Sequence, residues 1–155
     1  MSKTILITGA SNGFGNDAAE ALAVAGHQVF ATMRDVNTRH RGAAETLRSN
    51  GIETLELDVT SNASVDAAFA ALFKKTDGTL DVLVNNAGVF SQGVSETYTP
   101  EQVRDLFEVN VFGIQRVTRA ALPAMRKTKS GLIVNVGSIL GRVPAASSIP
   151  RPHTK

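Results

Sequence analysis

Short apolar runs alternate along this chain with longer segments in which apolar residues recur every three or four positions. The runs are rich in β-branched residues and do not alternate strictly with polar ones, which is typical of strands buried on both faces. Such strands, each followed by a helix, predict the α/β class with a doubly wound parallel sheet. The predicted strands are Thr4–Thr8, Gln28–Met33, Ile52–Leu57, Leu80–Val84 and Gly131–Val136.

The segments between these strands predict the helices that cover the sheet. Apolar or small residues from Gly15 to Gly26 lie on one helix face, and a clean apolar stripe runs from Val65 to Phe73. A more polar helix is expected over Arg39–Asn50.

The longest helix is predicted to begin at a well-marked start signal. Thr99 can cap it, Pro100 suits its first turn, and Gln102 completes a capping box. Its apolar stripe extends from Val103 to Ala121, and Pro123 is expected to kink or end it.

The chain of 155 residues fits one compact domain. Its 16 Lys and Arg residues against 14 Asp and Glu give a net charge of +2, too balanced to favour a nucleic-acid partner. The absence of cysteine excludes disulfides, thiolate zinc sites and cysteine nucleophiles. No apolar run approaches the ~18 residues that cross a membrane, and no secretory signal is recognised, so we expect a soluble cytoplasmic protein.

The turn after the first strand, Thr8–Gly15 (TGASNGFG), is rich in glycine. Glycines allow a tight turn and let backbone N–H groups approach a diphosphate, while the following helix presents its positive end. A glycine-rich turn without a ligand is the alternative, but its position between a strand and a helix favours a dinucleotide. The lysine and Ser/Thr that end a P-loop ATPase motif are absent, since Phe14-Gly15-Asn16 stands there, which argues against that class.

Four motifs in order resemble the short-chain dehydrogenase/reductase family between Thr4 and Val143. They are the TGxxxGxG spacing of the glycine turn, the segment Asn85–Gly88 (NNAG), Asn110 in the long helix, and Ser138 after the fifth strand. Phe14 departs slightly, because an aliphatic residue is commoner there. The resemblance implies a Rossmann-type sheet with about five strands of an incomplete larger fold. It further implies a dinucleotide-binding domain over residues 1–143, followed by an irregular tail over 144–155.

The resemblance also implies a reaction and the residues that bind its cofactor. The family transfers hydride between a nicotinamide cofactor and a carbonyl or alcohol of a small-molecule substrate. Asp58 matches the family's adenine contact, although Asp58 or Thr60 could instead cap the next helix. Asn85 is interpreted as structural, tying strand ends together. The residues matched to cofactor binding are Gly9, Ser11, Asn12, Gly13, Phe14, Gly15, Arg34, Asp58, Val59, Asn86, Ala87 and Gly88.

The end of the second strand bears on which cofactor is used. Met33 stands where NAD-preferring relatives carry an acidic residue, and Arg34 follows it. A guanidinium suits the 2′-phosphate of NADP, so NADP is favoured over NAD, although Asp35 partly opposes that charge. Solvated loop charges are the alternative interpretation of Arg34 and Asp35. His27 and His40 look like exposed loop or helix residues rather than metal ligands.

Two of the four catalytic residues of the family can be matched. Asn110 lies on the apolar stripe of the long helix, where a polar side chain needs hydrogen bonds; a satisfied core asparagine is the alternative. Ser138 follows the fifth strand, where an ordinary loop serine is the alternative. By resemblance, serine bonds the substrate oxygen and asparagine supports a proton-relaying water.

The tyrosine and lysine of the family have no convincing match. Tyr98, the single tyrosine, is followed four positions later by glutamine rather than lysine. Counting from Ser138 reaches Arg151 between two prolines, and Lys155 four positions further is interpreted as chance or a relic.

These departures suggest a truncated or frameshifted member of the family, inactive as written. A non-catalytic dinucleotide-binding protein and an inactive gene fragment are the alternatives. An incomplete sheet would leave an edge exposed. We therefore expect marginal stability, aggregation, or self-association into a homo-oligomer.

Overall fold

A five-stranded parallel sheet organises the protein. The computed structural model describes residues 1–91 and 93–138. The strand order is β3-β2-β1-β4-β5, so the chain first winds outward from β1 to β3 and then crosses back to β4. This arrangement confirms the predicted doubly wound α/β sheet of Rossmann type. The strands are β1 (Thr4–Ile7), β2 (Gln28–Met33), β3 (Glu53–Glu56), β4 (Val82–Asn85) and β5 (Leu132–Asn135).

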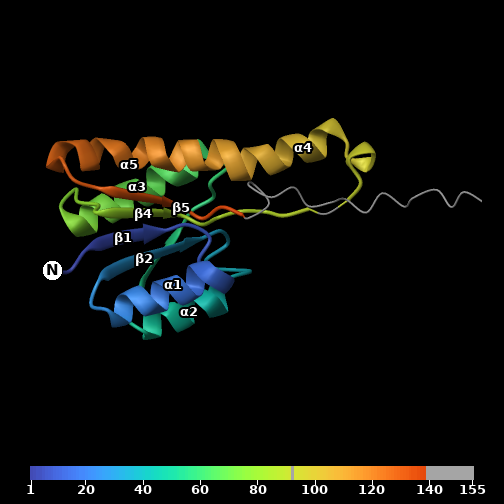
Figure 1. Cartoon of the computed structure of the whole chain (residues 1–155). Coiled ribbons are helices and arrows are strands. Elements are labelled where there is room, and N and C mark those ends of the chain that lie inside the picture. The colour runs from blue at the N-terminus through green and yellow to red at the C-terminus, as the bar shows by residue number, and fades with distance from the viewer. Residues whose placement is uncertain (92, 139–155) are drawn as a thin grey trace, which may run out of the picture.

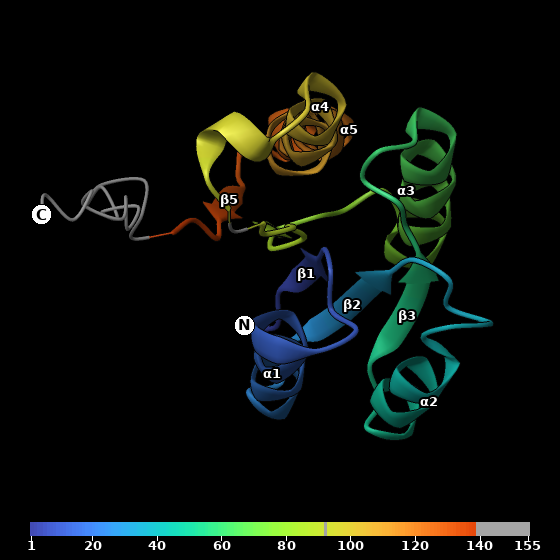
Figure 2. The same cartoon turned by 90° about the vertical axis from the view of Figure 1, so that its right-hand side faces the viewer.

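Helices cover the sheet from both sides, as Figures 1 and 2 show. One side carries α1 (Gly13–Val24) and α2 (Arg41–Ser49), and the other carries α3 (Asn62–Thr76) and α5 (Ile114–Thr128). Alternate side chains of each strand feed these two layers: Ile5 and Ile7 of β1 pack with α1 and α2, whereas Leu6 packs with α3 and α5. Two apolar cores on opposite faces therefore fix the sheet in place.

The long helix begins as predicted but is not one regular helix. Thr99 and Gln102 form the full capping box at the start of α4 (Pro100–Phe107). A π-helical turn, η2 (Glu108–Gly113), then leads directly into α5. Pro123 was expected to kink or end the helix, and it does not end it, because α5 continues through it to Thr128. Pro123 and Arg119 both face solvent, so water can satisfy the Arg119 carbonyl that loses its helical donor.

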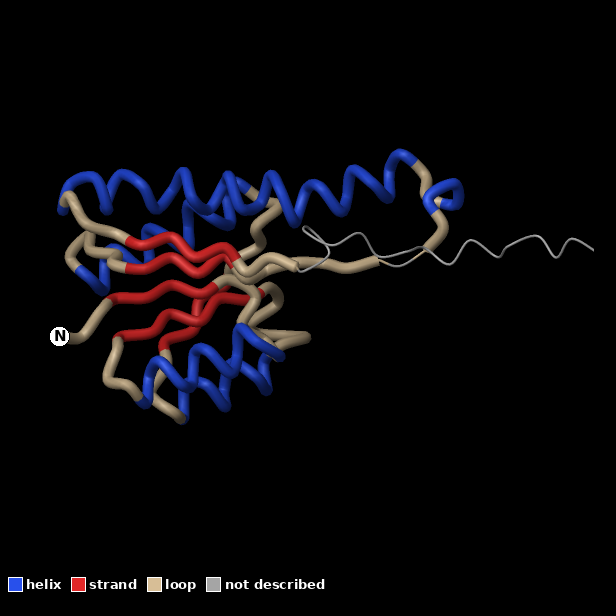
Figure 3. The backbone as a smooth tube through the Cα atoms, in the orientation of Figure 1, coloured by secondary structure: helices blue, strands red, loops and turns tan. Residues whose placement is uncertain are grey.

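The predicted apolar stripe of this helix is buried only in its second half. Val117 and Ala121 of α5 are fully buried, whereas Phe107 of α4 is 52% exposed. α4 extends past the carboxyl ends of the strands, where no sheet lies beneath it (Figure 3). No helix within residues 1–91 and 93–138 is long and apolar enough to cross a membrane.

β5 is the outermost strand of the described sheet, and one of its faces stays open. Ile133 packs into the core beside α5. Leu132, Val134 and Val136 alternate with it, and all three are exposed, Leu132 by 56%. Within the described residues, the edge strand therefore presents a row of exposed apolar side chains on one face.

We predict that Phe30→Ala lowers the free energy of unfolding by about 3–5 kcal/mol, because the ring is fully buried between β2 and the α3–α5 layer. The matched control is Phe14→Ala, whose ring is 82% exposed and whose loss should cost less than about 0.5 kcal/mol. Urea unfolding followed by circular dichroism measures both. Equal effects of the two substitutions would contradict this assignment of the core.

Candidate functional site

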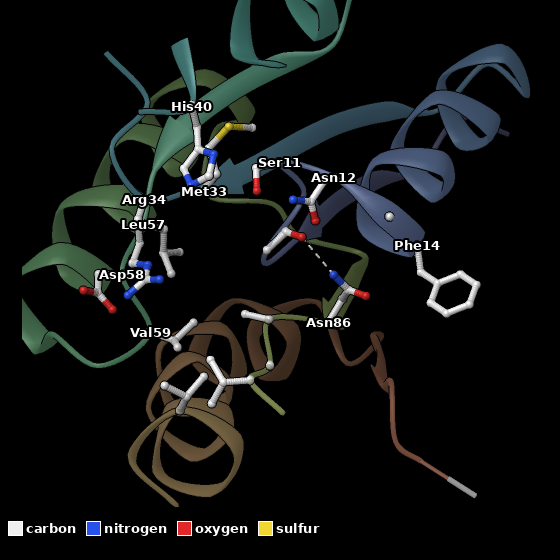
Figure 4. Close-up of a pocket in the computed structure, with 16 residues that line it drawn as sticks. Ser11, Asn12, Phe14, Met33, Arg34, His40, Leu57, Asp58, Val59 and Asn86 are labelled. Carbon is white, nitrogen blue, oxygen red and sulfur yellow. Dashed lines mark hydrogen bonds between the residues drawn. The ribbon is translucent and has the colours of Figure 1, made fainter. Parts of the chain in front are cut away.

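A cavity of about 300 Å³ opens at the carboxyl ends of β1 to β4. It lies where the strand order reverses between β1 and β4, the place at which doubly wound sheets bind their ligands. Figure 4 shows side chains from four strand ends converging on it. Its lining consists of Gly9, Ser11, Asn12, Gly13, Phe14, Met33, Arg34, His40, Leu57, Asp58, Val59, Asn86, Ala87, Gly88, Val89 and Val109.

All the residues matched to cofactor binding line this cavity except Gly15. Gly15 is buried inside α1, where a Cβ would stand 2.4 Å from Asn86 Nδ2 and 2.6 Å from the Gly9 carbonyl oxygen. That glycine is therefore required for close packing of α1 on the strand ends, and it does not border the cavity.

The glycine turn is locked onto the segment that follows β4. The Thr8 hydroxyl accepts hydrogen bonds from the backbone N–H groups of Asn86 and Ala87, both at 3.0 Å. In return, Asn86 Nδ2 donates to the carbonyls of Thr8 and Gly9, also at 3.0 Å. Gly9 has φ +68°, and a Cβ there would stand 2.7 Å from Ala87 Cα. Two loops far apart in sequence thus form one wall that admits no side chain at Gly9.

The start of α1 faces the cavity without a side-chain cap. Asn12 occupies the cap position in extended conformation, and its side chain makes no capping hydrogen bond. The first amides of α1 therefore lack the partner that a cap supplies, which is the usual arrangement at anion sites. The ring of Phe14 points away from the cavity (Figure 4), so an aromatic residue is accommodated there in place of the commoner aliphatic one.

The ends of β2 and β3 form the other side of the cavity. Met33 is buried, and the exposed guanidinium of Arg34 forms no hydrogen bond or ion pair with any described residue. Asp58 Oδ1 accepts from the N–H and the hydroxyl of Thr60 at 2.9 and 2.8 Å. Neither residue caps α3, as one interpretation of the sequence held, because Ser61 takes that position and accepts from Ser64 N.

Asn110 and Ser138 lie outside the cavity lining. Asn110, in the π turn, accepts from Val89 N at 3.0 Å and donates to Val89 O at 2.9 Å. It is half-buried and satisfied, and it fixes a residue that does line the cavity. Ser138 is exposed beyond the end of β5.

Asn85 ties strand ends together, as the sequence suggested. Its Nδ2 donates to Asn135 Oδ1 of β5 at 2.8 Å and to Thr118 Oγ1 of α5 at 3.2 Å. The hydroxyl of Tyr98 donates to Ser91 Oγ in the segment before α4, and Tyr98 does not line the cavity. Arg151 and Lys155, which stand at the sequence positions of the family's tyrosine and lysine, lie outside the described residues.

Sequence reasoning left out five lining residues: Met33, His40, Leu57, Val89 and Val109. Leu57 and Val89 adjoin predicted site residues and could have been found by extending those motifs. His40 was interpreted as exposed, but it is half-buried with its ring directed at the cavity (Figure 4). No motif marks it, since only the folding of the loop after β2 returns it to the strand end.

Residues 3–150 match the family model described as short chain dehydrogenase. The chain belongs to the short-chain dehydrogenase family. It is 39% identical over 137 residues to the 3-ketodihydrosphingosine reductase of Bacteroides thetaiotaomicron, covering 88% of this chain and 47% of that protein. The chain spans about half the length of the curated relatives it matches.

Solved structures of this family share the fold. A short-chain dehydrogenase from Streptomyces avermitilis superposes with a TM-score of 0.84 at 41% identity, covering 92% of this chain and 52% of that one. A variant of actinorhodin polyketide ketoreductase, solved with NADPH, gives a TM-score of 0.85 at 33% identity and covers 94% of this chain and 56% of its own. The described sheet and helices are therefore those of a short-chain dehydrogenase.

We predict that Gly9→Ala destabilises this short-chain dehydrogenase by about 1–3 kcal/mol, because the position combines positive φ with a backbone contact that a methyl group would violate. The matched control is Gly42→Ala in α2, where a Cβ meets no atom within 4 Å. There the change should be neutral or stabilise by up to about 1 kcal/mol. Chemical unfolding measures both variants, and a harmless Gly9→Ala would refute the described loop geometry.

Proposed function

We propose that this chain binds NADP(H) in the cavity at its strand ends and serves a short-chain oxidoreductase that transfers hydride between NADP(H) and a small carbonyl or alcohol substrate. The observation that carries the proposal is the cavity itself. Uncapped amides of α1 border it on one side, and on the other lies the guanidinium of Arg34, which has no partner among the residues that the structure describes. Anion-binding groups thus stand at two separated points of one cleft, as a cofactor with a diphosphate and a further phosphate requires.

The residues present fit such a cofactor. Ser11, Asn12 and Gly13 would bind the diphosphate through the backbone at the start of α1. Asp58 and Val59 would contact the adenine, and Asn86–Gly88 would lie beside the nicotinamide half. Because Gly9 has no side chain, the turn after β1 can contact the backbone of Ala87. When bound, the nicotinamide ring supplies or accepts the hydride.

The choice of NADP rests on the end of β2. Met33 offers no carboxylate to accept hydrogen bonds from the ribose hydroxyls that distinguish NAD. Arg34 follows it with a guanidinium whose paired donors match a phosphate. The polyketide ketoreductase that shares this fold was solved with NADPH, which supports the same choice.

Ser138 and Asn110 would act on the substrate side. Ser138 would hydrogen-bond the substrate oxygen from beyond the end of β5, and Asn110 would hold Val89 at the cavity wall. A proton must also reach or leave that oxygen. Tyr98 is the one tyrosine of the chain, and its hydroxyl is bonded to Ser91 outside the cavity lining. The role proposed for Ser138 and Asn110 is therefore to bind and orient, and neither is proposed to donate the proton.

We predict that NADPH binds more tightly than NADH and that Arg34→Gln weakens NADPH binding by about tenfold while leaving NADH binding unchanged. Cofactor fluorescence measures both dissociation constants, and the chain contains no tryptophan to interfere. Arg39→Gln is the control, because Arg39 is exposed on the same loop and does not line the cavity. Failure of both cofactors to bind, or equal losses for both at Arg34→Gln, would overturn the assignment.

We also expect no NADPH oxidation above background with a panel of ketones and aldehydes, because Tyr98 is bonded to Ser91 outside the cavity lining. Absorbance of the reduced nicotinamide follows the reaction, and the fluorescence titration run in parallel shows that the cofactor is bound. Turnover that Ser138→Ala abolishes would contradict this expectation and show that a proton donor exists.

A further inference from the structure

The loop between β2 and α2 folds back on itself and returns to the strand end. Asp35 adopts a left-handed conformation with φ +52°, and its carbonyl oxygen accepts from the N–H groups of both Thr38 and His40 at 3.0 Å. This closed turn places the residue before α2 beside the end of β2. His40 thereby reaches the same cavity wall as Arg34, although five residues separate them in sequence.

The turn is also anchored from outside. The Glu56 carboxylate at the end of β3 accepts from the N–H groups of Asp35 and Val36 at 2.7 and 2.8 Å. Val36 is buried among the residues of the α1–α2 layer. The position of His40 is thus fixed by β3 and by the core, and does not depend on a freely moving surface loop.

The imidazole of His40 has a free hydrogen-bonding edge in the cavity. It is half-buried beside Met33 and forms no side-chain hydrogen bond or ion pair with any residue that the structure describes. Figure 4 shows His40 and Arg34 on the same side of the cavity, both directed into it. Two nitrogen-rich side chains with no anionic partner therefore converge on one region.

We propose that His40 is a second contact for the 2′-phosphate of NADP(H), donating to it beside Arg34 when the imidazole is protonated. This inference rests on the proposed function, since it assumes that the cavity binds a nicotinamide dinucleotide. A phosphate that carries more than one negative charge can pair with two cations. Without the phosphate, a protonated His40 would place a second positive charge beside Arg34.

The surrounding charges support this coupling between phosphate and proton. The ionisable groups that line the cavity with His40 are Arg34, just after β2, and Asp58, just after β3, and Asp58 Oδ1 already accepts two bonds from Thr60. On its own loop and helix stand Asp35, Arg39 and Arg41, all exposed, and Arg41 is paired with Glu45. The glycine turn over Gly9–Gly15 contributes no ionisable side chain. Bound phosphate should therefore favour the imidazolium, and protonation should in turn favour the phosphate.

The pH dependence of NADP⁺ affinity distinguishes the contribution of His40 from that of the 2′-phosphate itself. The second ionisation of a phosphate lies near pH 6, so the 2′-phosphate gains charge and affinity as pH rises. The His40 contribution runs the other way, because a charged imidazole attracts the phosphate and a neutral imidazole, favoured at higher pH, does not. Comparing wild type with His40→Gln at each pH cancels the ligand's own titration, which both proteins share.

The experiment measures NADP⁺ and NAD⁺ binding by calorimetry for the whole chain at about pH 6 and about pH 8. We expect His40→Gln to weaken NADP⁺ binding about three- to tenfold at the lower pH and less than twofold at the higher one, with no change for NAD⁺. His27→Gln is the matched control, since His27 is equally half-buried and lies at the opposite end of the strands.

The outcomes distinguish the two proposals. An equal loss of NADP⁺ affinity at both pH values, no loss at either, or an equal loss for NAD⁺ would overturn the role of His40 while leaving cofactor binding intact. Failure of the wild-type chain to bind either dinucleotide would overturn the proposed function and this inference together.

Discussion

The backbone lock between the ends of β1 and β4 is the contact on which the rest of the site depends. The Thr8 hydroxyl and the Asn86 amide together satisfy four backbone groups that would otherwise be unpaired at the strand ends. These side-chain bonds fix the turn after β1 against the segment after β4. The amides at the start of α1 therefore stay directed at the cavity. Gly9 is required by the same contact, since any side chain would separate the two loops.

Most of the fold could be predicted from the sequence because burial sets its pattern. The central strands β1 and β4 supply side chains to the cores on both faces of the sheet, so each is a short apolar run, and the helix stripes match the faces that pack on it. The π turn at Glu108–Gly113 could not be predicted. No residue type in this segment marks a π turn. The turn instead goes with a tertiary contact, in which Asn110 is presented to the backbone of Val89.

The site divides in the same way. The half built from backbone is marked in the sequence by glycines, since the backbone contact of Gly9 at positive φ and the packing around Gly15 leave no room for a Cβ. Its side-chain half is harder to find. Arg34 is adjacent to a strand end and could be predicted, whereas His40 reaches the cavity only through the turn that Asp35 closes and Glu56 anchors. No local pattern in the sequence encodes that return.

This division has a consequence for how selectivity arises in the cavity. The walls that would bind a diphosphate are made of backbone, so they are fixed by the glycine turn and its lock and cannot distinguish one dinucleotide from another. Discrimination must come from side chains that reach the ribose end, where the sheet supplies a position after β2 and the following loop supplies another. The sequence of a loop can change without disturbing the core. Here the loop after β2 is held by Glu56, whose carboxylate accepts two of its backbone N–H groups. Under the proposed function, the common part of the cofactor would therefore meet a rigid wall of backbone, and the variable part would meet a few charges held by one anchored turn.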